Sequence, residues 1–428
     1  MAKTLLAILA AAVFAAPVTG ADQIRLDNGA TLTVNSIPGT GAVSVIASYA
    51  TGYADDPAGL AQAAHLAEHL RVTGAIGDDP PGANADRLNT VGAANAETLA
   101  ALTYYDFALP PDQLALAFAT EAARLTALKV TDADIAREIP RVRAEVESVA
   151  GSPGLFVGKF AAMAAAQCWL HDAAEAGVRL IRPPDADAMR RFIDDHHRVD
   201  RLTLTVTGDV DPQRAAALFR EHLGPIAKPA HRAAPASRDF AGLPALRRVG
   251  WDVPAKVVLI AMPGSWAESG VHLQALATRA TFALNQKELV RSTVSSGPTV
   301  PVGGLPLFVG VCLHPDADED EALALLHDAL DAALATDPAQ TRGTAAFIAA
   351  AQPRPDAGTV RDMAARFAAQ RGMEPHVAGA MIMGNHALQS VLRVAPGDPT
   401  DDALTAATRE AFARDNRRVL ILNPPKAE

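Results

Sequence analysis

The sequence predicts an α+β protein built from two similar halves, and three observations support this prediction. Strand patterns and helix patterns occur along the whole chain, which at 428 residues is too long for one ordinary domain. The second half repeats the first in weakened form: a strand at 256–264 matches one at 43–50, and a helix at 271–277 matches one at 64–70. Between the halves, residues 225–245 are rich in Pro and Ala, which is typical of a linker.

The N-terminus, residues 1–20, predicts a secretory signal peptide. A short basic segment ending at Lys3 precedes an apolar run at 4–16, and small residues follow at 18–21. This run is short for a membrane anchor, although an uncleaved N-terminal anchor remains the alternative. We therefore expect a periplasmic or secreted protein without stable insertion in a membrane.

The predicted N-terminal domain, residues 21–224, mixes strands and helices. A hairpin is expected over 24–34, because Asn28 is followed by Gly in a strong turn signal. One strand is expected over 90–107, and the two prolines at 110–111 mark the start of the next helix. The other expected elements are strands at 43–50 and 202–209 and helices at 64–70, 110–125, 131–149, 163–169, 185–195 and 212–223.

The predicted C-terminal domain, residues 246–428, follows the same plan. Residues 295–304, rich in Ser, Gly and Pro, are expected to form a mobile loop. The helix at 271–277 carries no pair of His and no Glu on the matching face, so we expect a metal site in the first half alone. The expected elements are strands at 256–264, 307–313 and 419–422 and helices at 271–277, 318–334 and 401–415.

Composition narrows the range of functions. The formal charge of -10 and the 5% of aromatic residues argue against nucleic-acid binding, because neutralising phosphates needs a basic surface. Cys168 and Cys312 are the only two cysteines, so the chain has no disulfide framework. An exported protein could form one bridge between them, and the sequence leaves that question open.

The stretch from His65 to His69 carries the strongest chemical signal. On a helix, two His residues four apart lie on one face, and Glu68 falls on the same face. Two imidazoles with a nearby carboxylate base are what a catalytic zinc needs, and H-x-x-E-H is the inverted form of the zincin motif. A chance occurrence in a chain of this length has a probability of roughly one per cent. Such a site also needs a third protein ligand.

A later helix offers candidates for that ligand. Thr131 and the acids after it are typical of a helix start, and an apolar stripe follows at helical spacing. Glu138 and Glu145 are seven residues apart and share a face, whereas Glu147 points elsewhere. For any of these residues alone, a solvated face shared with the arginines of the same helix is the alternative.

Together these motifs resemble the pitrilysin family of inverted-motif zinc peptidases, in the branch similar to mitochondrial processing peptidase. The resemblance rests on H-x-x-E-H, on the later pair of Glu138 and Glu145, and on 95–98 followed by 103–105, which is similar to the family's active-site strand. It covers most of the chain after the signal. It implies an α+β fold of two similar domains, each a mixed β-sheet packed with helices, that face each other across a cavity.

The resemblance also implies a role for each motif residue. His65, His69 and Glu145 are expected to bind Zn²⁺, with Glu68 as the general base. Glu138 is expected to hold a ligand or a water molecule in place without binding the metal itself. These roles give an exported zinc metalloendopeptidase that hydrolyses extended peptides through a zinc-activated water.

The resemblance also predicts where the substrate binds, and the sequence departs from the family pattern at one place. An extended peptide is expected to add as a strand beside Asn95 and Ala96. The family usually has Gly-Leu-Ala immediately before the first His, whereas here residues 62–64, Gln-Ala-Ala, separate that triplet from His65. We therefore expect the motif helix to begin in a non-standard way.

Relatives of this kind do not all act in the same way. Some keep the fold without catalysis, so a non-catalytic or metal-binding partner subunit of a heterodimeric complex is the alternative function. Relatives that act alone, or as the complete half of a pair, carry an Arg and a Tyr in the second domain that hold the substrate across the cavity. The tyrosines of this chain all lie in its first quarter; they are Tyr49, Tyr53, Tyr104 and Tyr105.

We therefore expect a homologous second subunit to supply the Arg/Tyr pair. The alternative is a homodimer or a monomer in which Ser295, Ser296 or His386 serves as the donor.

Overall fold

In the computed structural model, the described residues are 22–425 without 58, 101, 151–154, 171–172, 180–182, 231–241, 254, 264–265, 296–306, 315, 351–355 and 392–400. Several sequence predictions lie outside them: the signal segment at 1–20, the middle of the linker at 225–245 and nearly all of the loop at 295–304. The same holds for Ser296 and for the side chains of Ser295 and His386.

The first half of the chain supplies a mixed six-stranded sheet with the order β1-β2-β9-β3-β6-β5. Strands β2 and β9 run parallel, and the other neighbouring pairs are antiparallel. The strands are Asp22–Arg25 (β1), Thr31–Ser36 (β2), Val43–Tyr49 (β3), Ala93–Thr98 (β5), Thr103–Leu109 (β6) and Leu202–Gly208 (β9).

A second, similar sheet has the order β12-β13-β11-β14-β10-β8, and the second half supplies all of its strands except β8, which comes from the first half. Strand β10 runs parallel to β14 and to β8, and the other pairs are antiparallel. Strands β14, β11, β13 and β12 thus repeat the order and directions of β9, β3, β6 and β5, which confirms two similar domains. The strands are Glu175–Ala176 (β8), Leu246–Trp251 (β10), Val257–Met262 (β11), Val290–Ser295 (β12), Leu307–Leu313 (β13) and Arg418–Asn423 (β14).

Helices surround both sheets. Those of the first half are Ala63–Thr73 (α2), Ala83–Val91 (α3), Leu114–Thr126 (α4), Asp132–Ala150 (α5), Leu155–Leu170 (α6), Ala186–His196 (α7) and Pro212–Leu223 (α8). Those of the second half are Trp266–Leu284 (α9), Glu319–Ala335 (α10), Pro338–Ala350 (α11), Ala357–Arg371 (α12), Pro375–Val391 (α13) and Asp402–Ala411 (α14). Two short strands, Ala75–Ile76 (β4) and Leu128–Lys129 (β7), pair with each other.

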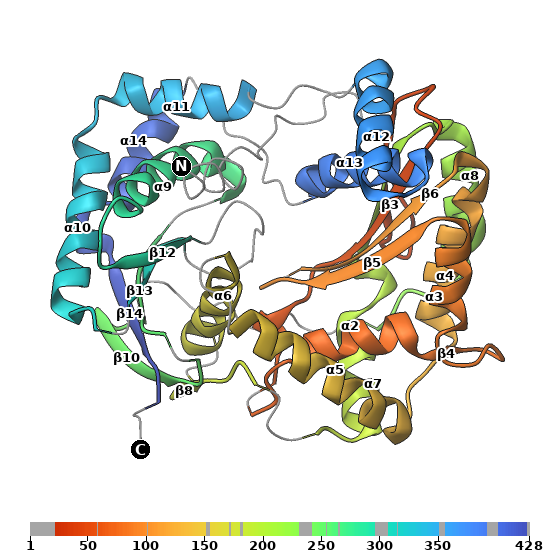
Figure 1. Cartoon of the computed structure of the whole chain (residues 1–428), viewed down its shortest axis with the longest axis horizontal. Coiled ribbons are helices and arrows are strands. Elements are labelled where there is room, and N and C mark those ends of the chain that lie inside the picture. Colours follow the sequence, from red (N-terminus) through yellow and green to blue (C-terminus); the bar gives the residue numbers. More distant parts are fainter. Residues whose placement is uncertain are drawn as a thin grey trace.

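Each half packs one helix on the sheet of the other half. Helices α4 and α8 cover one face of the first sheet, while α13 of the second half lies against β3 and β6 on the other face (Figure 1). There Met383 packs with Ala42 and Ala108. In the same way α6 of the first half packs on the second sheet, where the ring of Trp169 lies 6.2 Å from that of Phe308. The domain boundaries at 21–224 and 246–428 therefore stay a prediction from sequence, because packing crosses them in both directions.

Most predicted elements occur within a few residues of their expected positions. Strands β1 and β2 form the expected hairpin, and Gly29 in its turn has φ 97°, a left-handed conformation that favours glycine. The single strand expected over 90–107 is wrong. The end of α3 occupies 90–91, and the rest is the hairpin of β5 and β6, closed where the Leu99 N–H donates to the Leu102 carbonyl at 2.7 Å. The sequence between the two strands, Leu-Ala-Ala-Leu, contains none of the residues that mark turns.

The structure also answers the question of the cysteines. Cys168 and Cys312 are both free thiols, buried in the core where α6 meets the second sheet. Burial raises the pKa of Cys168 to about 12, so this thiol is inert. Within the part of the chain that the structure describes, no helix combines the length and apolar character needed to span a bilayer.

Candidate metal centre

Helix α2 carries the H-x-x-E-H motif, and a buried carboxylate caps its first turn. Both oxygens of Asp56 accept backbone hydrogen bonds, one from Gln62 and one from Ala64, at 2.8 Å each. These N–H groups have no partner inside the helix, so the carboxylate satisfies donors that would otherwise be buried and unpaired. Burial raises the pKa of Asp56 to about 8, although its bonds to the backbone act in the opposite direction.

Helix α5 supplies the acids and packs against α2. Its apolar stripe, which includes Ile139 and Val142, is buried, and this turns Glu138 and Glu145 toward the motif helix. Glu138 is fully buried, whereas 56% of the Glu145 side chain is exposed. Glu147 accepts from Arg179 at 2.7 Å and lies outside this arrangement.

The structure brings His65, His69 and Glu145 together as a group that could hold a metal ion. Their ligand atoms all lie within 4.8 Å of one another. Oε2 of Glu145 is 3.1 Å from Nε2 of His65 and 3.5 Å from Nε2 of His69. Zinc bonds of 2.0–2.2 Å at tetrahedral angles separate two ligands by roughly 3.4 Å. The donor set and its spacing therefore fit zinc, and the exposed Glu145 leaves one side open.

Glu138 holds His69 from the side away from this group. Its Oε2 lies 3.3 Å from Nδ1 of His69, and its Oε1 accepts from the hydroxyl of Thr73 at 2.8 Å. Burial alone would raise the pKa of Glu138, but bonds from His69, Thr73, Arg137 and Arg141 lower it to about 2. The carboxylate is therefore ionised and can accept a hydrogen bond from the imidazole. Arg137 and Arg141, two of the three arginines of the expected solvated face (with Arg143), thus contact Glu138 directly.

His65 has an equivalent partner in Gln62, which the sequence analysis did not select. The side-chain oxygen of Gln62 lies 2.8 Å from Nδ1 of His65. The insertion of three residues before the motif was visible in the sequence. Their position alone could not show that one of these side chains would face the imidazole of His65.

Glu68 lies one helical turn after His65 on α2, and only 7% of its surface is exposed. The hydroxyl of Thr98 donates to its Oε2 at 2.6 Å. Thr98 ends β5, which also carries Asn95 and Ala96. In the described part of the chain β5 pairs with β6 on one side and with no strand on the other. The expected base and the expected peptide-binding strand are therefore joined by one hydrogen bond.

All four tyrosines belong to the first half, and their side chains are buried. Tyr49 donates to Glu121, which also accepts from Arg71 of the motif helix. The hydroxyl of Tyr105 lies 3.2 Å from Nε2 of His197. Tyr104 donates to Glu97 at 2.8 Å, and the ring of Tyr53 lies edge-on to His65 at 6.4 Å; both are buried.

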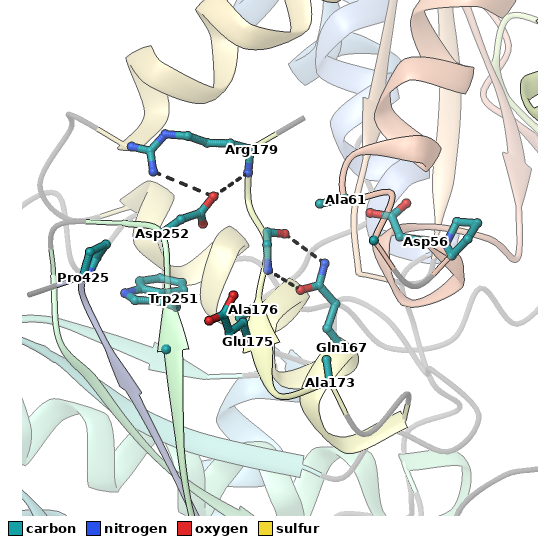
Figure 2. A pocket seen from close by; sticks show the side chains of 14 residues that line it. Asp56, Ala61, Gln167, Ala173, Glu175, Ala176, Arg179, Trp251, Asp252 and Pro425 are labelled. Atoms are coloured by element: carbon teal, nitrogen blue, oxygen red, sulfur yellow. Dashed lines mark hydrogen bonds and ion pairs between the residues drawn. The ribbon is translucent and has the colours of Figure 1, made fainter. Parts of the chain in front are cut away.

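A cavity of about 520 Å³ lies where the two halves meet (Figure 2). Its wall combines Asp56 and Arg179 of the first half with Trp251 and Asp252 of the second. None of the three residues of the metal group lines it. The cavity therefore lies behind the start of α2 and is separate from the metal group.

Comparison with known proteins supports the fold. No protein-family model and no curated protein matches the sequence. A protease from Helicobacter pylori has a similar structure, with a TM-score of 0.65 and 16% identity over 94% of this chain and 99% of that one. The peptidase M16 inactive domain from Pseudomonas fluorescens gives a TM-score of 0.62 at 13% identity, over 96% of this chain and 99% of that one.

Pitrilysin gives a TM-score of 0.59 at 16% identity, over 97% of this chain. The match covers 46% of pitrilysin, so this chain corresponds to about half of that protein. At such identities the similarity concerns the fold alone. The chain thus has the two-domain α+β fold of these peptidases, a fold that it also shares with an inactive domain.

Proposed function

We propose that the chain is a zinc-dependent peptidase of the pitrilysin family that hydrolyses extended peptides. The observation that carries this proposal is the group of His65, His69 and Glu145, with Glu68 buried beside it, in a fold shared with peptidases. A zinc ion held by this group would act as a Lewis acid and lower the pKa of a water molecule.

The protein's own residues would then move the proton and hold the ligands. The hydroxyl of Thr98 donates a hydrogen bond to Oε2 of Glu68. Oε1 would therefore accept the proton of the attacking water and return it to the leaving nitrogen. Glu138 would keep the ring of His69 in position, because an ionised acceptor at Nδ1 fixes the orientation of the imidazole.

We propose that the substrate pairs with β5. An extended peptide that added to β5 on the side away from β6 would lie beside Asn95 and Ala96. Thr98 at the end of the same strand contacts the base, so a peptide in that register would approach Glu68 with its backbone fixed. For the location we propose export to the periplasm or the medium, on the basis of residues 1–20.

The second candidate function is a non-catalytic subunit. It is favoured by the similarity to an inactive domain, whose TM-score is close to that of the protease. Against it stands the complete set of two imidazoles, one carboxylate as the third ligand, and a buried base. Peptide cleavage by the purified chain, abolished by a chelator and restored by zinc, would decide between the two functions.

The metal proposal predicts about one zinc per chain and its loss in Glu145→Gln. Removing the ionised ligand should weaken zinc affinity by at least about 100-fold, more than the loss of an outer partner causes. The matched control is Glu147→Gln on the same helix, whose exposed ion pair with Arg179 should matter little. Metal analysis after dialysis measures both variants. If Glu145→Gln kept its zinc while Glu147→Gln lost it, the third ligand would be misplaced by two residues.

Glu138→Gln should weaken zinc affinity or activity by tens-fold without emptying the site. The amide cannot carry the negative charge that accepts from His69, and its NH₂ group would face Arg137 and Arg141. Competition with a chromophoric chelator gives the affinity. An unchanged affinity together with unchanged activity would show that Glu138 takes no part in metal binding and is only a buried partner of the two arginines.

A further inference from the structure

Gln62 is in an unusual backbone conformation at the start of the motif helix. Among the described residues it is the only non-glycine with positive φ, at 69°. This left-handed region is costly for a residue with a Cβ atom. The residue is also fully buried, and its backbone N–H donates to Asp56 at 2.8 Å. Strained residues that the surroundings hold in place cluster at functional sites, so the contacts of this side chain bear on function.

Both ends of the Gln62 side chain have a defined partner. Nε2 donates to the carbonyl of Val178 at 2.8 Å, and Oε1 lies 2.8 Å from Nδ1 of His65. A backbone carbonyl can only accept, so the amide NH₂ must face Val178 and the amide oxygen must face His65. His65 must then carry its proton on Nδ1. Its Nε2, which faces Glu145, is left with a free lone pair, as a metal ligand requires.

The carbonyl that orients Gln62 is itself held by the second half of the chain. The carboxylate of Asp252, which follows β10, accepts the N–H of Val178 at 2.8 Å and that of Arg179 at 3.0 Å. Figure 2 shows Asp252 beneath Arg179 at this junction. A continuous series of hydrogen bonds therefore runs from the second domain through Gln62 to His65.

We propose that Gln62 is a positioning residue that selects the tautomer of His65 in which Nε2 binds the metal. This inference rests on the proposed function, because it assumes that His65 is a ligand. It adds a residue from the three-residue insertion that distinguishes this chain from the family pattern. It also makes the metal affinity of the first domain depend on a contact with the second.

The test is the zinc affinity of the full-length chain, measured by competition with a chromophoric chelator. Gln62→Met has a similar shape but no acceptor, and we expect its affinity to fall 10–100-fold. Gln62→Glu keeps an acceptor for Nδ1 but loses the donor to the Val178 carbonyl, so its affinity should fall less than that of Gln62→Met. A purely structural role predicts the reverse order, because a buried site beside Met163 tolerates Met better than a carboxylate.

Gln167→Met is the matched control. Gln167 is another buried carboxamide, and it bonds the N–H and carbonyl of Gly177 at 2.8 and 2.9 Å without touching a metal ligand. Its zinc affinity should equal that of the wild type. If Gln62→Met fails to fold by circular dichroism, Gln62→Gly removes the same side chain while relaxing the left-handed backbone, and the same 10–100-fold loss is expected.

The outcomes separate this inference from the proposed function. Affinity within twofold of the wild type in Gln62→Met, or in Gln62→Gly, overturns the inference. A wild-type chain that binds zinc but cleaves no peptide overturns the proposed peptidase, while the affinity series still decides the role of Gln62. A wild-type chain that binds no zinc overturns both.

Discussion

Glu68→Gln should abolish peptide hydrolysis while its zinc content stays at that of the wild type. Glu68 is buried, and the hydroxyl of Thr98 holds one of its oxygens, so the amide fits the same space. An amide cannot take a proton from water, and loss of a positioned general base typically costs 10²–10⁴ in rate. We would measure kcat and KM on an extended peptide together with metal content. Because the base acts on the reacting water, kcat should fall with little change in KM.

Thr98→Val tests the same carboxylate with a smaller expected loss of activity. It removes the hydroxyl that orients Glu68 but keeps the carboxylate, so we expect a partial loss, smaller than that of Glu68→Gln. Both proteins should fold and bind zinc, since neither residue belongs to the metal group. Full activity in Glu68→Gln would remove Glu68 from the mechanism. Loss of zinc in the same variant would make it a ligand and not a base.

The local parts of the site could be predicted from sequence because they depend on helical spacing alone. Positions four apart place His65 and His69 on one face of α2, and positions seven apart place Glu138 and Glu145 on one face of α5. The buried stripe of α5 then determines which of its acids face the motif helix. The sheet order of the second half likewise bears out the repeat that was visible in the sequence.

What could not be predicted depends on contacts between distant segments or on local structure without a sequence signal. The packing of α6 and α13 on opposite sheets involves apolar helices whose patterns would suit either half. The turn after Thr98 has no Gly, Pro, Asn or Asp, so one long strand was expected where a hairpin forms. Gln62 faces His65 only because Asp56 and Val178 hold it there, and neither contact follows from residue spacing.

The second prediction with a large expected effect on peptide hydrolysis concerns a partner subunit. The second half of the chain contains no tyrosine, and the four in the first half are already buried there. Tyr49, Tyr104 and Tyr105 have their hydroxyls within hydrogen-bonding distance of Glu121, Glu97 and His197, respectively. By the family resemblance, an active site also needs an Arg and a Tyr from a second domain, so the proposed metal site of this chain would be half of an active site. We therefore propose a homologous second subunit that lacks H-x-x-E-H and supplies the Arg/Tyr pair.

Co-expression with such a homologue should raise peptide hydrolysis by about 10²–10³, because one lost donor to a developing oxyanion costs that much. The chain alone, the pair, and the pair with the homologue's tyrosine changed to Phe would be assayed on one peptide at equal zinc content. The Phe version should return the rate to that of the chain alone. A pair built on Glu68→Gln should be inactive, which excludes turnover by the homologue itself. Full activity of the chain alone would end the partner hypothesis and leave the donor to a residue of this chain.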